Sequence, residues 1–263
     1  MSRTLTWSYG GGVQSVAIGV LVAQGKLPRP DMAAICDTGR EMASTFTFLR
    51  DHMQPFLNRS GVGIEIQVVP HSLSHADLYY KTGLTLIPAY TKTEDGVGLF
   101  GDMSYREGRL AAFCSGQWKR DTMERWLRLQ GVESCDQWIG YSLDEWRRRK
   151  NDHRKWCHLV YPLIDLKITR DDCKRLISEA GLPVPKKSRC WMCPHQNDEE
   201  WQEVKDSPEE FAMAVALEKE INDRDPDSGG DLFLYPGRVP LELAKFDGSK
   251  QPERACNEGG CWT

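Results

Sequence analysis

The chain has 263 residues, 40% of them hydrophobic, and this length suits one α/β domain with an appendage. Its formal net charge of −4 excludes a uniformly basic protein that wraps nucleic acid, although it is compatible with a local basic patch. The sequence contains no apolar run of about 18 residues and no secretory signal. We therefore expect a cytoplasmic protein with no membrane partner.

The first predicted element is a strand that leads through a glycine-rich turn into a helix. Residues 5–8 are apolar and β-prone, and apolar residues recur at helical spacing from Val13 onward. The three glycines between them let the backbone come close to a bulky anion, and the helix's first turn offers N–H groups to phosphate. A glycine turn without a ligand is the alternative. The candidate phosphate-binding residues are Ser8, Gly10, Gly11, Gly12, Gln14 and Ser15.

A second strand is predicted over residues 30–37, and an Asp-Thr-Gly tripeptide that begins at Asp37 ends it. The apolar spacing of residues 42–53 predicts a helix, and residues 63–69 predict a third strand. This βαβαβ order indicates a parallel sheet, in which ligands bind at the carboxyl ends of the strands. An aspartate at that edge can accept hydrogen bonds from a ribose hydroxyl or an adenine amine.

The glycine turn resembles the pyrophosphate-binding loop of the ATP pyrophosphatase (PP-loop) superfamily, whose pattern reads Ser-Gly-Gly-x-Asp-Ser. Gly11, Gly12 and Ser15 match that pattern. Gly10 stands where serine is usual, and Gln14 stands where aspartate is usual. The resemblance implies an open, mostly parallel, twisted sheet with helices on both faces, of the adenine nucleotide alpha hydrolase-like kind.

The later Asp-Thr-Gly, followed by Thr45, is similar to the phosphoadenosine phosphosulfate (PAPS) reductase branch of that superfamily. In that branch the loop holds the phosphate end of an adenosine nucleotide, and the tripeptide lies beside the nucleoside. The resemblance therefore implies that Asp37, Thr38 and Gly39 bind ATP, PAPS or adenosine phosphosulfate (APS). A Mg²⁺ ion at the phosphates and a homodimer are further expectations.

The middle of the chain is less regular. Residues 82–109 lack periodicity, which indicates either a functional loop or a surface excursion. A helix is predicted from about 120 to 129 and a fourth strand over 136–141. Ser142 and Glu145 form a capping pattern for a helix that carries the basic residues 147–150. This basic run is either a solvated face or a patch that contacts phosphate.

A fifth strand is predicted over residues 160–166. Thr169 then begins a helix that ends at Gly181, and further helices are predicted over 208–223 and 239–246. We expect residues 1–182 to form the nucleotide-binding domain and residues 183–263 to form a C-terminal region with a cysteine-bearing tail.

The nine cysteines indicate metal, cluster or redox roles in a cytosolic protein. Cys190 and Cys193 form a Cys-x-x-Cys between prolines, where nearby lysines and an arginine favour the thiolate form. Two thiolates do not complete a metal site. Cys114 lies 76 residues before Cys190 and is the next candidate ligand.

This spacing resembles that of the cluster-containing APS reductases, where a Cys-Cys pair followed by Arg-Lys and a later Cys-x-x-Cys bind a [4Fe-4S] cluster. Here Phe113 replaces the first cysteine, and Lys119 lies one residue further on. The resemblance implies the ligands Cys114, Cys190 and Cys193. The fourth ligand is then a tail cysteine, or one iron stays uncapped and holds sulfide. A zinc site that includes His195, and thiols without metal, are the alternatives.

The tail supplies the remaining catalytic candidates. Residues 253–256 loosely resemble the mobile tail in which PAPS reductases carry a nucleophilic cysteine, which makes Cys256 the counterpart. Cys256 and Cys261 are alternatively a persulfide carrier and its resolving partner. With Lys119 they make up the predicted catalytic set. The other four cysteines are expected to be buried structural thiols, and these are Cys36, Cys135, Cys157 and Cys173.

Three functions are compatible with these features. The first is reduction of PAPS or APS, in which a thiol reductant releases sulfite. The second is ATP-dependent adenylation and sulfur insertion into tRNA or DNA. The third is a nucleotide-sensing module that is not an enzyme. We favour a PAPS-reductase-like enzyme of sulfur metabolism, of a kind common in phages and mobile elements.

Replacement of Cys190 by serine tests the predicted cluster. We expect the anaerobically purified Cys190→Ser variant to lose iron and colour, because a serine hydroxyl does not replace a thiolate ligand. Visible absorption with iron, sulfide and zinc analysis measures this, and Cys173→Ser is the control. Full iron content in Cys190→Ser would contradict the ligand assignment.

Overall fold

The structure is a computed structural model that describes residues 3–79, 81, 83–92, 107–150, 154–224 and 231–248. These residues form two compact units. The first contains the described residues of 3–75 and 116–189, and the second contains those of 76–115 and 190–248. This division differs from the one at residue 182 in that the second unit begins at residue 190 and also includes a segment from the N-terminal half.

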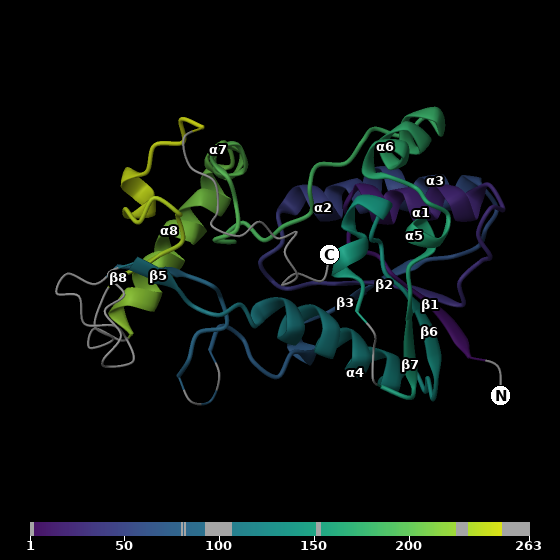
Figure 1. Cartoon of the computed structure of the whole chain (residues 1–263), viewed down its shortest axis with the longest axis horizontal. Coiled ribbons are helices and arrows are strands. Elements are labelled where there is room, and N and C mark those ends of the chain that lie inside the picture. Colours follow the sequence, from purple (N-terminus) through teal and green to yellow (C-terminus); the bar gives the residue numbers. More distant parts are fainter. Residues whose placement is uncertain are drawn as a thin grey trace. The chain divides into compact units, whose positions relative to one another are not determined.

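The first unit is built on a five-stranded sheet in which every neighbouring pair of strands is parallel (Figure 1). The strand order is β3-β2-β1-β6-β7. The predicted parallel α/β sheet is therefore confirmed. The strands are β1 (Thr4–Ser8), β2 (Met32–Cys36), β3 (Ile66–Val69), β6 (Cys135–Trp138) and β7 (Cys157–Val160).

The strand order reverses beside β1. The chain runs outward from β1 to β2 and β3, and then returns to the other side of β1 for β6 and β7. In the ladder, Thr6 lies opposite Met32 of β2 and opposite Gln137 of β6. Such a reversal opens a crevice at the carboxyl ends of the strands, which is where doubly wound sheets bind ligands.

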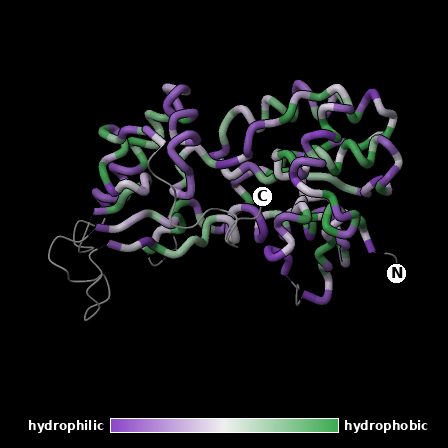
Figure 2. Tube along the Cα trace, turned by 45° about the horizontal axis from the view of Figure 1, so that its top comes forward, coloured by the Kyte–Doolittle hydropathy of each residue, from purple (hydrophilic) through white to green (hydrophobic). Residues whose placement is uncertain are grey.

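Helices cover both faces of the sheet (Figure 1). Trp7 and Ile35 pack into the core beneath α1, whereas Cys36 packs into the core beneath α4 (Asp121–Leu129). This alternation follows from the period of two along a strand. Figure 2 shows hydrophobic and hydrophilic stretches distributed along the whole described chain. The helices on the α1 side are α1 (Val13–Ala23), α2 (Ala43–Phe48), α3 (Gln54–Arg59), α5 (Pro162–Asp165) and α6 (Arg170–Glu179).

Two π-helical turns interrupt the helices of this unit. Leu49–Met53 joins α2 to α3, so the predicted helix from residue 42 is one continuous helical run with a local bulge. Gly116–Arg120 precedes α4, whose predicted span is confirmed. Turns of this kind occur often at functional sites, because the extra residue changes where the following side chains point.

Three sequence predictions for the secondary structure are wrong. The fifth strand ends at Val160, and Pro162 then opens the short helix α5, since its fixed φ suits the first turn of a helix. Ser142 begins a 3₁₀ helix, Leu143–Arg148, with no side-chain cap. The helix predicted over 239–246 is only the 3₁₀ turn Leu241–Leu243.

The second unit combines a small antiparallel sheet with helices. The strands β4 (Tyr90–Lys92), β5 (Glu107–Arg109) and β8 (Asp231–Phe233) have the order β5-β4-β8. Two of them lie in the segment that lacked periodicity in the sequence. Helix α8 (Pro208–Asp223) has the predicted bounds, and α7 (Asp198–Lys205) precedes it.

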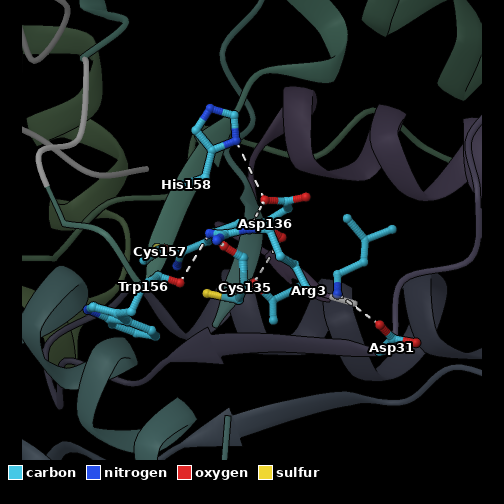
Figure 3. Close-up of polar contacts among 10 residues, drawn as sticks. Arg3, Asp31, Cys135, Asp136, Trp156, Cys157 and His158 are labelled. Carbon is cyan, nitrogen blue, oxygen red and sulfur yellow. Dashed lines mark hydrogen bonds and ion pairs between the residues drawn. The ribbon is translucent and has the colours of Figure 1, made fainter. Parts of the chain in front are cut away.

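Arg3 ties β1 to its neighbours at the amino edge of the parallel sheet (Figure 3). Its Nε donates to Asp136 Oδ1 over 2.6 Å, and Nη2 donates to the carbonyl oxygens of Cys135 and Trp156. On the other side, the Leu5 N–H donates to the Asp31 carboxylate over 2.8 Å. These contacts fix the position of the amino end of β1. The carboxyl end of the same strand is thereby held in place as well.

Two N-cap residues of this unit, Thr169 and Ser142, provide a matched test of capping. Thr169 Oγ1 accepts the Asp172 N–H, and Asp172 returns the bond to the Thr169 N–H, as predicted. Thr169→Ala should lower the free energy of unfolding by about 1 kcal/mol. Ser142→Ala should cost nothing, since the buried Ser142 hydroxyl has no hydrogen-bond partner within the described residues. Urea denaturation measures both, and equal losses would contradict the difference in capping.

Candidate functional site

A pocket of about 50 Å³ opens at the carboxyl edge of the parallel sheet, where the strand order reverses. Its walls come from the ends of β1, β2 and β6, from the chain after β2, and from the π turn and start of α4. All of these belong to the first unit. The lining residues are Ser8, Tyr9, Gly10, Ile35, Cys36, Glu41, Lys119, Arg120, Met123, Gln137, Ile139 and Gly140.

The glycine loop connects this pocket to the start of α1. Gly11 has φ +77°, and a Cβ added there would lie 2.4 Å from Thr45 Cγ2, so only glycine fits. Gly12 is the N-cap of α1 and offers no side chain to the first N–H groups. The Gly10 N–H donates to Ser15 Oγ over 2.9 Å and closes the loop on itself. The start of α1 thereby presents uncapped backbone N–H groups, the usual partners of an oxyanion.

A fourth glycine that the sequence analysis did not single out completes this wall. Gly140 follows β6, and a Cβ there would lie 3.1 Å from Ser15 Oγ and 3.3 Å from Ser15 N. The end of β6 thus approaches the first turn of α1 as closely as backbone allows. A glycine just after a strand in a parallel sheet was the signal available in the sequence.

A nearly buried ion pair forms part of the pocket wall. Lys119 Nζ lies 2.6 Å from Glu41 Oε1, with the two side chains 18% and 2% exposed. Lys119 sits in the π turn, and its carbonyl accepts a hydrogen bond from the Cys36 thiol over 3.4 Å. The neighbouring Arg120 also lines the pocket and pairs with Asp121 at 2.7 Å. The pocket wall thus contains two cations, each of which is paired with a carboxylate, and Asp121 lies outside the lining.

Gln14 makes polar contacts with other elements of the first unit. Its Nε2 donates to Glu145 Oε2 over 2.9 Å, and its Oε1 accepts from Arg170 Nη1 over 3.2 Å. The side chain therefore links α1 to the 3₁₀ helix and to α6. An aspartate, which the PP-loop pattern has at this position, would place a second carboxylate against Glu145. The uncharged glutamine avoids this repulsion between two carboxylates.

The same contacts explain why the predicted capping box at Ser142 does not form. Glu145 binds Gln14 and Arg148 in place of the Ser142 N–H. Arg148 is buried over the Tyr141 ring, 4.3 Å from the ring centroid. The basic run is therefore divided, because Arg148 packs inside while Arg147, Arg149 and Lys150 are exposed.

The Asp-Thr-Gly tripeptide forms the turn after β2. Asp37 Oδ1 accepts the Gly39 N–H over 2.7 Å, and Gly39 has φ +68°. Thr38 is buried, and its Oγ1 accepts the Arg40 N–H over 3.2 Å. The tripeptide does not itself line the pocket, but it separates two lining residues, Cys36 and Glu41. Its local hydrogen bonds fix the turn that carries Glu41.

The cysteines predicted as metal ligands lie in the second unit. Cys114, Cys190 and Cys193 are partly exposed, and the Cys193 N–H donates to the Cys190 carbonyl over 3.2 Å. Arg109 Nη1 lies 3.5 Å from Nδ1 of the buried His195. No three His, Cys, Asp or Glu side chains within the described residues are grouped as a metal site requires.

The tail candidates, Cys256 and Cys261, lie outside the described residues. The four cysteines predicted as structural thiols are confirmed as buried. Burial raises the pKa of Cys36 and that of Cys173 to about 12, so neither thiol is poised as a nucleophile. No disulfide joins two of the seven cysteines that the structure describes.

A second, wider groove of about 240 Å³ lies on the α2 side of the glycine loop. Gly11 contributes to it, whereas Gly10 contributes to the first pocket. Its lining contains hydroxyl groups, the imidazole of His52 and the cation of Lys186, and no carboxylate is among the described lining residues. The remaining lining residues are Ser44, Thr45, Thr47, Phe48, Pro183, Val184 and Pro185.

Comparisons with protein families, with curated proteins and with solved structures find no match. Within the described part of the chain, no helix is both long enough and apolar enough to cross a membrane. The functional inference therefore depends on the chemistry of the site's own residues.

The Lys119–Glu41 pair can be tested by its effect on stability. Lys119→Met and Glu41→Gln should each lower the free energy of unfolding by about 3 kcal/mol, because each leaves one charge of a buried pair without the other. The double variant, which combines Lys119→Met with Glu41→Gln, should lose less than the sum of the two single losses.

The matched control is Lys174→Met, which removes a lysine from an exposed ion pair with Asp171 and should cost under about 1 kcal/mol. Urea denaturation of the wild type, the two single variants and the double variant gives the double-mutant cycle. If the loss of unfolding free energy in the double variant equals the sum of the two single losses, Lys119 and Glu41 do not stabilise one another.

Proposed function

We propose that the first unit binds an adenosine nucleotide and that the protein is a PP-loop enzyme of the PAPS-reductase-like kind, acting in sulfur transfer. One observation carries this proposal. A pocket at the reversal point of the sheet is lined by Gly10 of the glycine loop and by two cations, Lys119 and Arg120, and the loop leads from this pocket to the uncapped start of α1. That combination suits a phosphate group.

The pocket divides chemically into two parts. Gly10, Lys119 and Arg120 suit the phosphate end of the ligand. Ile35, Met123 and Ile139 offer apolar surface to a sugar or a base. A phosphorylated nucleoside has both kinds of surface, whereas inorganic phosphate alone leaves the apolar wall exposed to water.

The same residues suit either reaction of sulfur transfer. Attack on the α-phosphorus of ATP releases pyrophosphate, and attack of a thiolate on the sulfonate sulfur of PAPS or APS releases a nucleoside phosphate. In both cases negative charge accumulates on oxygens bound to the loop. Backbone N–H groups and Lys119, held in place by Glu41, would stabilise that charge without reorganising.

The exposed Arg147 and Arg149 support a nucleic acid as the acceptor in the ATP-dependent reaction, because they place two cations at the surface, where phosphates can reach them. A thiol reductant would take this place in sulfonucleotide reduction. The iron–sulfur cluster and the zinc ion stay predictions of the sequence, and the roles of Lys119 and the loop do not depend on either.

Isothermal titration calorimetry with ATP, APS and PAPS tests the nucleotide site. The wild type should bind at least one of them. Arg120→Met should weaken binding about 10-fold, equivalent to about 1.4 kcal/mol, because it removes a cation from the pocket. Gly140→Val should abolish binding, since its side chain would cover the Ser15 N–H.

Lys26→Met is the matched control, because this exposed lysine lies just beyond the opposite end of α1 and should leave affinity unchanged. Release of pyrophosphate with an acceptor, or of sulfite with a thiol, then identifies the reaction. A wild type that binds none of the three nucleotides, with or without Mg²⁺, would refute the proposed function.

A further inference from the structure

A column of polar side chains crosses the otherwise apolar α4 side of the sheet. The surrounding core consists of residues such as Met123, Trp126 and Leu127. Buried polar groups in such a setting are costly unless they are hydrogen-bonded to one another. The column runs from the amino edge to the pocket and contains Cys135, Cys157, Gln137 and Ser8.

The first link joins two thiols. Cys135 and Cys157 are directly opposite each other in the β6–β7 ladder, so their thiols lie side by side on the same face of the sheet. Figure 3 shows both at the amino edge, where Arg3 binds the carbonyl oxygens of Cys135 and Trp156. Both thiols are fully buried, with exposures of 0% and 1%. This end of the column is therefore held by the sheet itself.

The next two links have a fixed direction. The Cys157 thiol donates to Gln137 Oε1 over 3.2 Å, and Gln137 Nε2 donates to Ser8 Oγ over 2.7 Å. An amide oxygen only accepts and an amide nitrogen only donates, so neither link can reverse while the amide keeps this orientation. Because Ser8 Oγ accepts from Gln137, its own proton must be donated elsewhere.

Gln137 and Ser8 both line the pocket, and Gln137 is only 5% exposed. We propose that Gln137 is a positioning residue that turns Ser8 into a hydrogen-bond donor toward the pocket, so that the site selects a ligand with an oxyanion at that place. The ligand class is a phosphate or sulfonate group. This inference rests on the proposed nucleotide site and assigns the part of the nucleotide that Ser8 meets.

A glutamate at position 137 would reverse the direction of the hydrogen bond with Ser8, and this comparison shows why glutamine suits the position. A glutamate there would accept hydrogen bonds from both Cys157 and Ser8. The Ser8 proton would then point away from the ligand, and its lone pairs would face the pocket beside a new negative charge. An oxyanion would be repelled, whereas an uncharged nucleoside would be little affected.

Inorganic pyrophosphate and adenosine are the probes, and calorimetry on the full chain is the measurement. Gln137→Glu should weaken pyrophosphate binding by at least 30-fold, and the apolar, equally long Gln137→Met by about 10-fold. Adenosine binding should change by less than 3-fold in both. Cys157→Ala should weaken pyrophosphate binding by about 3-fold, and Cys157→Ser, which keeps a donor, should restore it.

The outcomes separate this inference from the proposed function. A wild type that binds pyrophosphate but no nucleotide refutes the proposed function, yet loss of that binding in Gln137→Glu still supports the role of Gln137. Three results would overturn the inference. The wild type does not bind pyrophosphate, or Gln137→Glu binds it as tightly as the wild type, or Gln137→Glu loses pyrophosphate binding and adenosine binding together. Thermal unfolding of each variant identifies any that fail to fold, and the two Cys157 variants then decide.

Discussion

The candidate site depends on two glycines at which chain segments pack tightly. A Cβ added at Gly11 would lie 2.4 Å from Thr45 Cγ2, and one added at Gly140 would lie 3.3 Å from Ser15 N in the first turn of α1. These contacts put the ends of two strands and the start of a helix around one point. The cations, the hydroxyl group and the apolar wall acquire their positions from that arrangement.

Each charged or polar group of the site is held by a partner side chain. Glu41 holds Lys119, Gln137 holds Ser8, and Gln14 bridges Glu145 and Arg170. Buried pairs of this kind contribute little net stability, because desolvation offsets most of the attraction. These pairs hold each group in a single orientation before a ligand arrives. Electrostatic stabilisation of a reacting oxyanion requires groups that are already oriented in this way.

The strands, the glycine loop and the capped start of α6 could be predicted because each depends on neighbours in the sequence. Glu41 and Gln137 were missed, since they reach the pocket only through the strand order and no local pattern marks them. Gly140 was missed although its place just after a strand was a signal in the sequence. The strand predicted over 160–166 was wrong because an apolar run of that length suits a buried strand and a short helix equally.

The π turn at Gly116–Arg120 also limits how this chain can vary in length. A π turn holds one residue more than the α-helical turn that it replaces. Deletion of a single residue within it would convert the segment to regular α-helix and rotate the side chains before the deletion by about 100° relative to those after it. Lys119 and the body of α4 would no longer face the pocket together, although every element of the sheet would be intact. Homologous chains that keep the site should therefore tolerate substitutions in this turn more readily than deletions.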